Sequence, residues 1–197
     1  MVYKRRVVLV DSNDQEIGTE ELLAAHQGEG KLHRAISVVL YRKTNESRIE
    51  VLLQKRGRVK PLWPLYWSNT VCTHPYPDED YLECAVRRLK EEMGIKIARS
   101  QLQVAYRFSY QVPFNDKLAE HELDTVIVGK IQNLKLKIQN DNSKFKINFN
   151  PDPSEVAEAK WMGWNELGRE METNGKEYTP WFRMIFQNGV MKETLNV

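Results

Sequence analysis

We expect the chain to fold around SNTVCTHPYPDEDYLECAVRRLKEEMGI, residues 68–95, in which a turn leads into a helix. Apolar residues recur there at helical spacing and give the helix one face to bury. They are Leu82, Ala85, Val86, Leu89 and Met93. Asp78 or Asp80 is placed to cap the start of this helix, and Gly94 is placed to end it.

The end of this helix carries Glu91 and Glu92 side by side. The helix dipole is negative at that end and like charges repel, so the position is unfavourable for both carboxylates. A divalent cation bound there would relieve both costs. Ahead of the helix stand Cys72 and His74. A lone cysteine is usually a buried apolar residue, although a nearby imidazole can instead lower its pKa or compete with it for a metal.

The length and composition fit one ordinary soluble domain. With 197 residues, 41% of them hydrophobic, the chain can bury a substantial core, and no low-complexity linker divides it. We therefore predict a single domain over residues 1–197. A net charge of +2 gives no general attraction to nucleic acid. The apolar run at 7–10 is too short for a signal peptide or a membrane span. We predict a cytoplasmic monomer or weak dimer, without nucleic-acid or membrane partners, in which Cys72 and Cys84 are free thiols.

Apolar and turn-forming residues predict the remaining elements. Strands are expected at 7–10, 35–41, 49–54, 102–111 and 123–131, the second and third forming a hairpin. A turn at 11–18 and a short helix at 19–27 are expected near the start. An extra hairpin is expected within 130–150. Trp161 should lie in a late strand, and Thr179 should open a final helix.

Basic and aromatic residues adjoin at 55–67. The run KRGRVK holds four cations in six residues, and PLWPLYW follows it directly. Such a charge run is usually a solvated face. Cations beside rigid aromatic walls also suit an anionic ligand with an apolar body, and the aromatic block favours that interpretation here.

Histidines and glutamates supply candidate metal ligands. His26, His33 and His74 stand near glycine, proline or polar loop residues, where a single histidine is more often structural. Glu120 and Glu122 lie two residues apart, so in an extended segment both point to the same side. Together these residues would suit Zn²⁺, Mn²⁺ or Mg²⁺, but no pair matches a compact metal motif.

The central stretch resembles the Nudix box, a loop and helix whose glutamates bind Mg²⁺ at a diphosphate. Its conserved positions coincide here with Glu79, Arg87, Leu89, Glu91, Glu92, Gly94 and Ile95. Two positions differ, because Thr73 stands where the box has glycine and Arg88 where it has a glutamate. Arg88 thus replaces a metal ligand that Nudix pyrophosphohydrolases use.

These departures and the flanking residues resemble the type 1 isopentenyl-diphosphate isomerase family. The matches run in order along almost the whole chain: LHRAISVVL, SNTVCTHP, RRLKEEMGI, EHELD, NPDPSEV and TPWF. The resemblance implies an α/β (α+β) fold with a Nudix-like mixed β-sheet between helices. It also implies interconversion of isopentenyl and dimethylallyl diphosphate through a tertiary carbocation, with proton addition and removal on opposite faces.

The resemblance implies a role for each matching residue. The acid/base pair falls on Cys72 and Glu122, with Tyr110 beside the glutamate and Trp161 as an aromatic wall for the cation. A site for Zn²⁺, Mn²⁺ or Mg²⁺ falls on His26, His33, His74, Glu120 and Glu122. Mg²⁺ at the substrate diphosphate falls on Glu92 and the backbone carbonyl of Cys72. The diphosphate-binding cations fall on Arg56, Lys60 and Arg88.

Some positions and alternatives stay open. Leu22 stands where some family members have a phosphate-binding lysine. Glu91 is then a helix-end partner for Arg87, and Trp63, Trp67 and Trp181 are candidates for apolar closure of the site. The competing hypotheses are a Nudix hydrolase of a nucleoside or isoprenoid diphosphate and a catalytically idle metal- or diphosphate-binding module.

Overall fold

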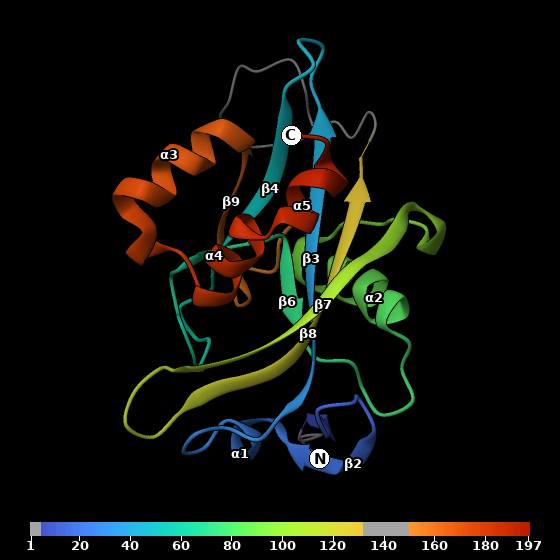
Figure 1. The fold of residues 1–197 in the computed structure, drawn as a ribbon, viewed down its shortest axis with the longest axis vertical. Coiled ribbons are helices and arrows are strands. Elements are labelled where there is room, and N and C mark those ends of the chain that lie inside the picture. The colour runs from blue at the N-terminus through green and yellow to red at the C-terminus, as the bar shows by residue number, and fades with distance from the viewer. Residues whose placement is uncertain (1–4, 132–149) are drawn as a thin grey trace.

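The computed structural model describes residues 5–131 and 150–197. Within them the strands are β1 (Arg6–Val10), β2 (Glu16–Glu21), β3 (His33–Lys43), β4 (Ile49–Arg56), β5 (Trp67–Ser68), β6 (Val71–Thr73), β7 (Leu102–Pro113), β8 (Ala119–Lys130) and β9 (Val156–Gly163). The helices are α1 (Leu22–Ala25), α2 (Tyr81–Met93), α3 (Trp164–Asn174), α4 (Pro180–Gln187) and α5 (Gly189–Leu195). Short 3-10 turns lie at Arg99–Gln101 and Gly175–Glu177. The strands form one mixed nine-stranded sheet (Figure 1).

Strand β3 lies between β6 and β8, the strands that carry Cys72 and Glu122. It is parallel to β8, with His33 beside Glu122, and antiparallel to β6, with Ser37 opposite Cys72. It also forms the predicted hairpin with β4. Residues 35–40 of β3 are all buried, as expected for an apolar run in the middle of a sheet. This strand therefore holds β6 and β8 in fixed positions on its two sides.

Helix α2 covers one face of the sheet. The Asp80 carboxylate caps it by accepting hydrogen bonds from the backbone N–H groups of Leu82 (2.9 Å) and Glu83 (3.2 Å). Gly94 ends it with a φ of 66°, a conformation that favours glycine. Its buried face packs against Ile36, Leu52 and Ile127 of the sheet. The predicted helix is confirmed, with Asp80 rather than Asp78 as the cap.

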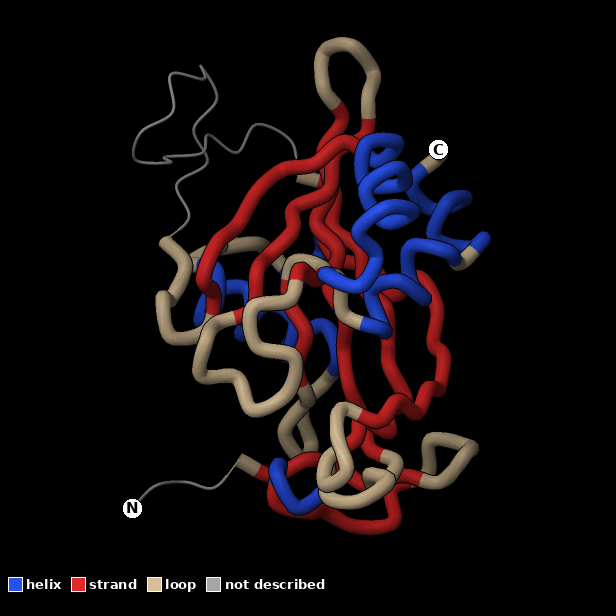
Figure 2. The backbone as a smooth tube through the Cα atoms, turned by 90° about the vertical axis from the view of Figure 1, so that its left-hand side faces the viewer, coloured by secondary structure: helices blue, strands red, loops and turns tan. Residues whose placement is uncertain are grey.

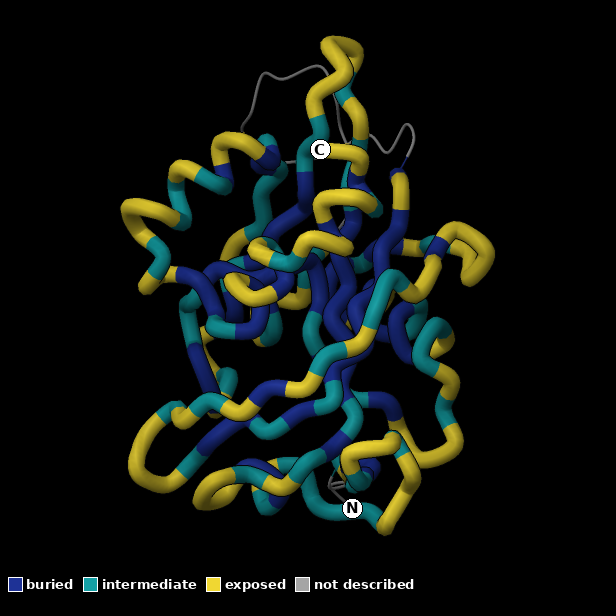
Figure 3. Tube along the Cα trace, in the orientation of Figure 1, coloured by how far each residue is buried: buried dark blue, intermediate teal, exposed yellow. Residues whose placement is uncertain are grey.

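The C-terminal helices cover the other face. Leu167 of α3, Phe182 and Ile185 of α4 and Met191 of α5 belong to a second apolar cluster with Val39 of β3 and its neighbours. Figure 2 shows these helices gathered on one side of the strands, and Figure 3 shows the buried residues concentrated in the middle of the sheet. The expected mixed sheet between helices is confirmed.

The N-terminal region differs from the sequence prediction. Residues 16–21 form strand β2, which pairs antiparallel with β1, where a turn was expected up to residue 18. Helix α1 spans only Leu22–Ala25, where a helix was expected over 19–27. The cause is the backbone of β1, whose free edge pairs with residues 16–21 and so keeps them extended.

Two further sequence predictions concern a hairpin within residues 130–150 and the absence of a membrane span. The hairpin predicted within 130–150 falls on residues 132–149, outside the described residues. Among the helices of the described ranges, none combines the length and the apolar character needed to cross a membrane.

Candidate active site

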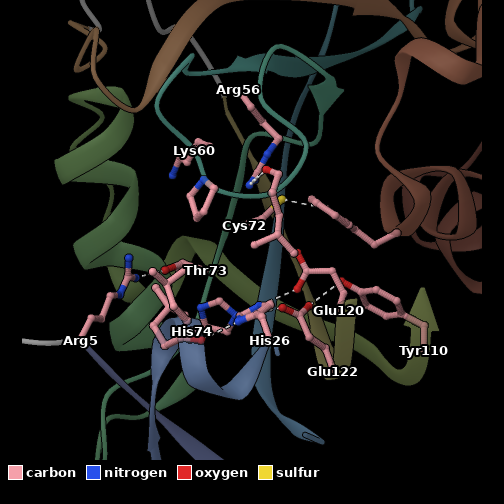
Figure 4. Close-up of a pocket in the computed structure, with 15 residues that line it drawn as sticks. Arg5, His26, Arg56, Lys60, Cys72, Thr73, His74, Tyr110, Glu120 and Glu122 are labelled. Atoms are coloured by element: carbon pink, nitrogen blue, oxygen red, sulfur yellow. Dashed lines mark hydrogen bonds and ion pairs between the residues drawn. The ribbon is translucent and has the colours of Figure 1, made fainter. Parts of the chain in front are cut away.

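The described residues enclose a pocket of ≈ 570 Å³, a volume that includes its open mouth. A space of this size suits a small molecule. Most of the residues predicted for the site line it together: His26, Arg56, Lys60, Cys72, His74, Tyr110, Glu120 and Glu122. Figure 4 shows them converging from several strands and loops.

Four potential metal ligands meet at one end of the pocket. His26, His33, His74 and Glu122 each offer a ligand atom, and these atoms lie within 4.8 Å of one another. The imidazoles of His26 and His33 are oriented by backbone carbonyls, through Nδ1 contacts of 2.7 Å to Leu22 and 2.6 Å to Lys31. Their Nε2 atoms are thereby turned toward the cluster, as is usual for metal-binding histidines.

The protonation of this cluster favours a bound cation. Burial and the neighbouring His26 lower the pKa of His33 to about 4, so its imidazole is neutral at pH 7. Burial likewise lowers the pKa of His74. The Nε2 atom of His33 is buried without a hydrogen-bond partner in the described parts of the chain. A neutral imidazole whose buried lone pair has no partner can bind a metal, so these residues fit a divalent cation.

The two carboxylates of β8 lie on the same face, as predicted, but in different electrostatic environments. Burial opposes ionisation of Glu120, but its hydrogen bond and ion pair with His26 at 2.7 Å hold its pKa below the usual value. Burial, followed by the charges of Glu120 and Asp124, raises the pKa of Glu122. Glu120 contacts His26 and lies beside the four-residue cluster. A cation would relieve the repulsion between these carboxylates.

Glu122 is also held by two partners on opposite sides. Its Oε1 atom lies 2.9 Å from His74 Nε2, and its Oε2 atom accepts a hydrogen bond of 2.6 Å from the Tyr110 hydroxyl. Tyr110 lies opposite Glu122 in the β7–β8 ladder. The ladder register therefore explains why these two predicted residues meet.

Cys72 faces the same pocket from β6. Its Sγ atom accepts a hydrogen bond of 3.0 Å from Trp181 Nε1 and donates one of 3.0 Å to Asn69 Oδ1. The Ser68 hydroxyl lies 3.3 Å away. Burial raises the pKa of the Cys72 thiol to about 12, so the group is a protonated thiol at pH 7. No disulfide involves it, since both Cys72 and Cys84 are free.

A cationic wall lies beside Cys72. Arg56 donates to the backbone carbonyls of Leu62 (2.9 Å) and Trp63 (3.1 Å) and lies over the Trp181 ring, with Cζ 5.2 Å from its centroid. The Lys60 ammonium forms an ion pair with Glu155 and lies 3.6 Å from Glu92 Oε1. Both residues line the pocket, as the sequence predicted.

Arg88 and Glu92 lie behind this wall and do not line the pocket. Arg88 pairs with Glu92 and, at 2.9 Å, with Glu91. The other Glu92 oxygen accepts a hydrogen bond of 3.3 Å from Gln54. The predicted contact of Glu91 with Arg87 is present at 3.2 Å. The fully buried Glu92 is thus contacted by two cations, Arg88 and Lys60.

Trp161 does not lie in the pocket, which corrects its predicted place as the aromatic wall. It lies opposite Leu52 in the β4–β9 ladder and packs with Leu52 in the cluster under α2. Arg42 covers its ring, with Cζ 4.4 Å from the centroid. Opposite residues share one face of a sheet, so Trp161 faces α2, away from Cys72. Trp181, at the start of α4, lines the pocket instead.

Arg5 is a pocket residue that the sequence prediction missed. Its guanidinium reaches Thr73, the residue at the glycine position of the Nudix box, and both line the pocket (Figure 4). In the sequence, Arg5 stands between Lys4 and Arg6, and such a basic run is usually solvated. Only the fold, which places it beside Leu22 and Thr73, shows that it belongs to the pocket.

Comparison with known proteins defines the class first. Residues 31–182 match the NUDIX domain family. The crystal structure of a NUDIX hydrolase from Alicyclobacillus acidocaldarius shares the fold, with a TM-score of 0.60 at 11% identity over 85% of this chain and 96% of that one. The chain is therefore a NUDIX protein.

The sequence relatives narrow this class. Isopentenyl-diphosphate Delta-isomerase 2 from Aromatoleum aromaticum is 34% identical over 97% of this chain and 89% of its own length. Isopentenyl-diphosphate Delta-isomerase from Pectobacterium atrosepticum is 35% identical over 91% of this chain and 88% of its own length. This chain belongs to the isopentenyl-diphosphate Delta-isomerase family, as the sequence resemblance predicted.

Proposed function

We propose that this protein interconverts isopentenyl diphosphate and dimethylallyl diphosphate in isoprenoid biosynthesis. One observation carries the proposal: Cys72 and the Tyr110–Glu122 pair face one pocket from opposite sides of β3, beside the cationic wall of Arg56 and Lys60. A diphosphate at that wall would direct the short apolar chain of the substrate between the thiol and the carboxyl group.

The reaction requires two proton transfers at different carbons. Addition of a proton to the terminal CH₂ of isopentenyl diphosphate leaves a tertiary carbocation at the branched carbon. Loss of a proton from the carbon next to the diphosphate-bearing CH₂ then forms the new double bond. Cys72 and Glu122 are the two groups that give and take these protons, and Tyr110 orients the Glu122 carboxyl group through its hydrogen bond.

The carbocation needs stabilisation without a nucleophile nearby. Trp181 supplies an indole face in the pocket, and a desolvated cation over such a face gains about 2 kcal/mol. Trp181 also fixes the Cys72 sulfur through its N–H group. Trp63, whose ring packs edge-on against Trp181 with centroids 5.4 Å apart, helps to exclude the water that would quench the cation.

Two divalent cations complete the proposal. His26, His33, His74, Glu120 and Glu122 would hold Zn²⁺, Mn²⁺ or Mg²⁺. Glu92 with the Cys72 carbonyl would hold Mg²⁺ at the substrate diphosphate once Glu92 exchanges its contacts with Arg88 and Lys60 for the cation. When bound, the first cation supplies the positive charge that fixes the Glu122 carboxylate. Arg56 and Lys60, which line the pocket, bind the diphosphate itself. Arg88 lies behind them against Glu92 and would join them only by exchanging that ion pair for the diphosphate. We place the protein in the cytoplasm, because a reducing compartment keeps Cys72 a thiol. We propose that it is a monomer or weak dimer.

The test follows conversion of isopentenyl diphosphate with Mg²⁺ present, together with proton exchange into substrate in deuterated water. Cys72→Ala and Glu122→Gln should each lower turnover by about 100- to 10,000-fold, the usual contribution of a general acid or base. Cys84→Ala is the matched control, since this second free thiol lies in α2, outside the pocket. It should keep wild-type turnover.

Three outcomes would contradict the proposal. Unchanged turnover and exchange in Cys72→Ala would remove that residue from the reaction. Phosphate release from a panel of diphosphates, with no exchange into isopentenyl diphosphate, would favour the Nudix hydrolase. Binding without either reaction would indicate an idle module.

A further inference from the structure

The pocket contains a guanidinium that the proposed roles leave unused. Arg5 stands just before β1, and its side chain is half-buried against the pocket wall. One of its terminal nitrogens donates to the Thr73 hydroxyl, and its Nε atom is buried without a hydrogen-bond partner in residues 5–131 and 150–197. The guanidinium is therefore oriented by a neutral oxygen, and it keeps N–H groups that can donate further hydrogen bonds.

The charge of Arg5 is not balanced locally. Among the described residues no carboxylate lies within ion-pair distance of its guanidinium, whereas Lys60 pairs with Glu155. Burial and the nearby Arg88 both lower the pKa of Arg5, so its environment disfavours a positive charge in this structure. An unpaired, partly buried charge is costly, and an anion in the pocket would offset that cost.

Arg5 lies next to Leu22 in the pocket wall. Leu22 lines the same pocket and its backbone N–H donates to the Arg5 carbonyl at 2.9 Å, continuing the β1–β2 ladder past Arg6 and Glu21. Residues 5 and 22 are thus neighbours just beyond the paired ends of β1 and β2. A cation at either position can serve the same region of the pocket.

We propose that Arg5 binds the substrate diphosphate, as a third cation of the wall formed with Arg56 and Lys60, and that it fills the role that a cation at position 22 would have. A guanidinium suits this task because its planar donors bind phosphate oxygens in pairs. Thr73 is the residue that orients it. The inference rests on the proposed function for the identity of the ligand, so its test needs a readout that does not depend on turnover.

The experiment measures affinity for inorganic pyrophosphate by calorimetry in the Mg²⁺-loaded protein, alongside KM and kcat for isopentenyl diphosphate. Arg5→Gln keeps donors for Thr73 but removes the charge. It should weaken pyrophosphate binding and raise KM by about ten- to hundredfold, the range of a hydrogen bond to a charged group. The value of kcat should change less than about threefold, because Arg5 contacts the diphosphate equally in ground and transition states.

Arg6→Gln is the matched control, since Arg6 is exposed and its guanidinium contacts Thr19 rather than the pocket. It should leave both pyrophosphate affinity and KM at wild-type values. Arg5→Gln combined with Leu22→Lys should recover at least tenfold of the lost affinity. Thermal unfolding of every variant establishes that each is folded.

The outcomes separate this inference from the proposed function. Wild-type pyrophosphate affinity in a folded Arg5→Gln variant overturns the role of Arg5, whatever the turnover. A double variant as weak as Arg5→Gln overturns the shared position of residues 5 and 22. If the wild type fails to isomerise its substrate but Arg5→Gln still loses pyrophosphate affinity, the proposed function is overturned and the anion site stands.

Discussion

Trp181 combines two contacts at a single residue, one to the Cys72 sulfur and one to the Arg56 guanidinium. Trp181→Phe keeps an aromatic face but removes the N–H group that holds the thiol. We expect kcat to fall by up to about tenfold, the value of one neutral hydrogen bond. In Trp181→Ala, kcat should fall by about thirtyfold or more, because the carbocation also loses the indole face that stabilises it. Steady-state kinetics on isopentenyl diphosphate measure both.

Trp161→Phe is the control for this prediction, because Trp161 packs under α2, outside the pocket. It should keep wild-type kcat. A large loss in Trp161→Phe with full activity in Trp181→Phe would return the aromatic wall to β9 and contradict the arrangement described here.

The sequence predicted residues that lie in distinctive segments. It did not predict residues whose role depends on the direction in which the side chain points. Cys72, His74 and Glu122 lie in short segments that match the family, so the resemblance located them. For Trp161 and Trp181, nothing in the local sequence says on which face of the sheet the indole lies. The sequence prediction missed Arg5 for a related reason. A short basic run has the same sequence whether one of its side chains is solvated or turned toward a pocket.

At the scale of elements, the loop before α2 is fixed to the second turn of the helix by a two-point ion pair. Arg87 donates to both oxygens of Glu79, at 2.5 Å through Nε and 2.7 Å through Nη2. Burial opposes ionisation of Glu79, but these hydrogen bonds outweigh it and hold its pKa below 4.5. Glu79→Gln should lower the free energy of unfolding at pH 7 by about 1 to 2 kcal/mol, the worth of hydrogen bonds to a charged group.

The pH dependence follows from the direction of this shift. A carboxyl group with a lower pKa in the folded state contributes stability above its unfolded pKa, and that contribution is lost as the pH falls through its folded pKa. The difference between wild type and Glu79→Gln, measured by chemical denaturation, should therefore shrink below about pH 4.5. Glu83→Gln, at an exposed site in the first turn, should differ from wild type by under about 0.5 kcal/mol throughout. A pH-independent difference for Glu79→Gln would mean that packing, not charge, is lost.

Elements with a strong local pattern were predictable, and β2 was not. Helix α2 has apolar spacing, an acidic cap and a terminal glycine, so several local signals agree. Strand β2 has no fully buried residue and lies at the edge of the sheet, so its side chains show no alternation to read. Its extended conformation comes from pairing with β1, and the local sequence does not predict that pairing.

At the scale of the whole molecule, the cluster of potential metal ligands exists only because the sheet brings distant segments together. His26 ends α1, His33 begins β3, His74 follows β6, and Glu122 lies beside His33 on β8. No pair has the spacing of a compact motif, so the residues themselves favoured a metal site only as a set, and the family resemblance supplied the grouping. The parallel β3–β8 register is the long-range feature that sequence spacing could not supply.

Because this cluster joins four segments, a bound cation should stabilise the entire fold. It binds the folded state only, so at 100 times its dissociation constant it adds about 2.7 kcal/mol. For a chain of this size that raises Tm by about 5 to 10 °C. We expect chelation to lower the Tm of the wild type by this amount and added Mn²⁺ to restore it. His74→Asn should lose most of the response, since it removes one ligand of the cluster. His121→Asn should keep it, because that histidine contacts the Gly30 carbonyl at 3.1 Å and lies outside the cluster. A full Mn²⁺ response in folded His74→Asn would show that the cation binds elsewhere.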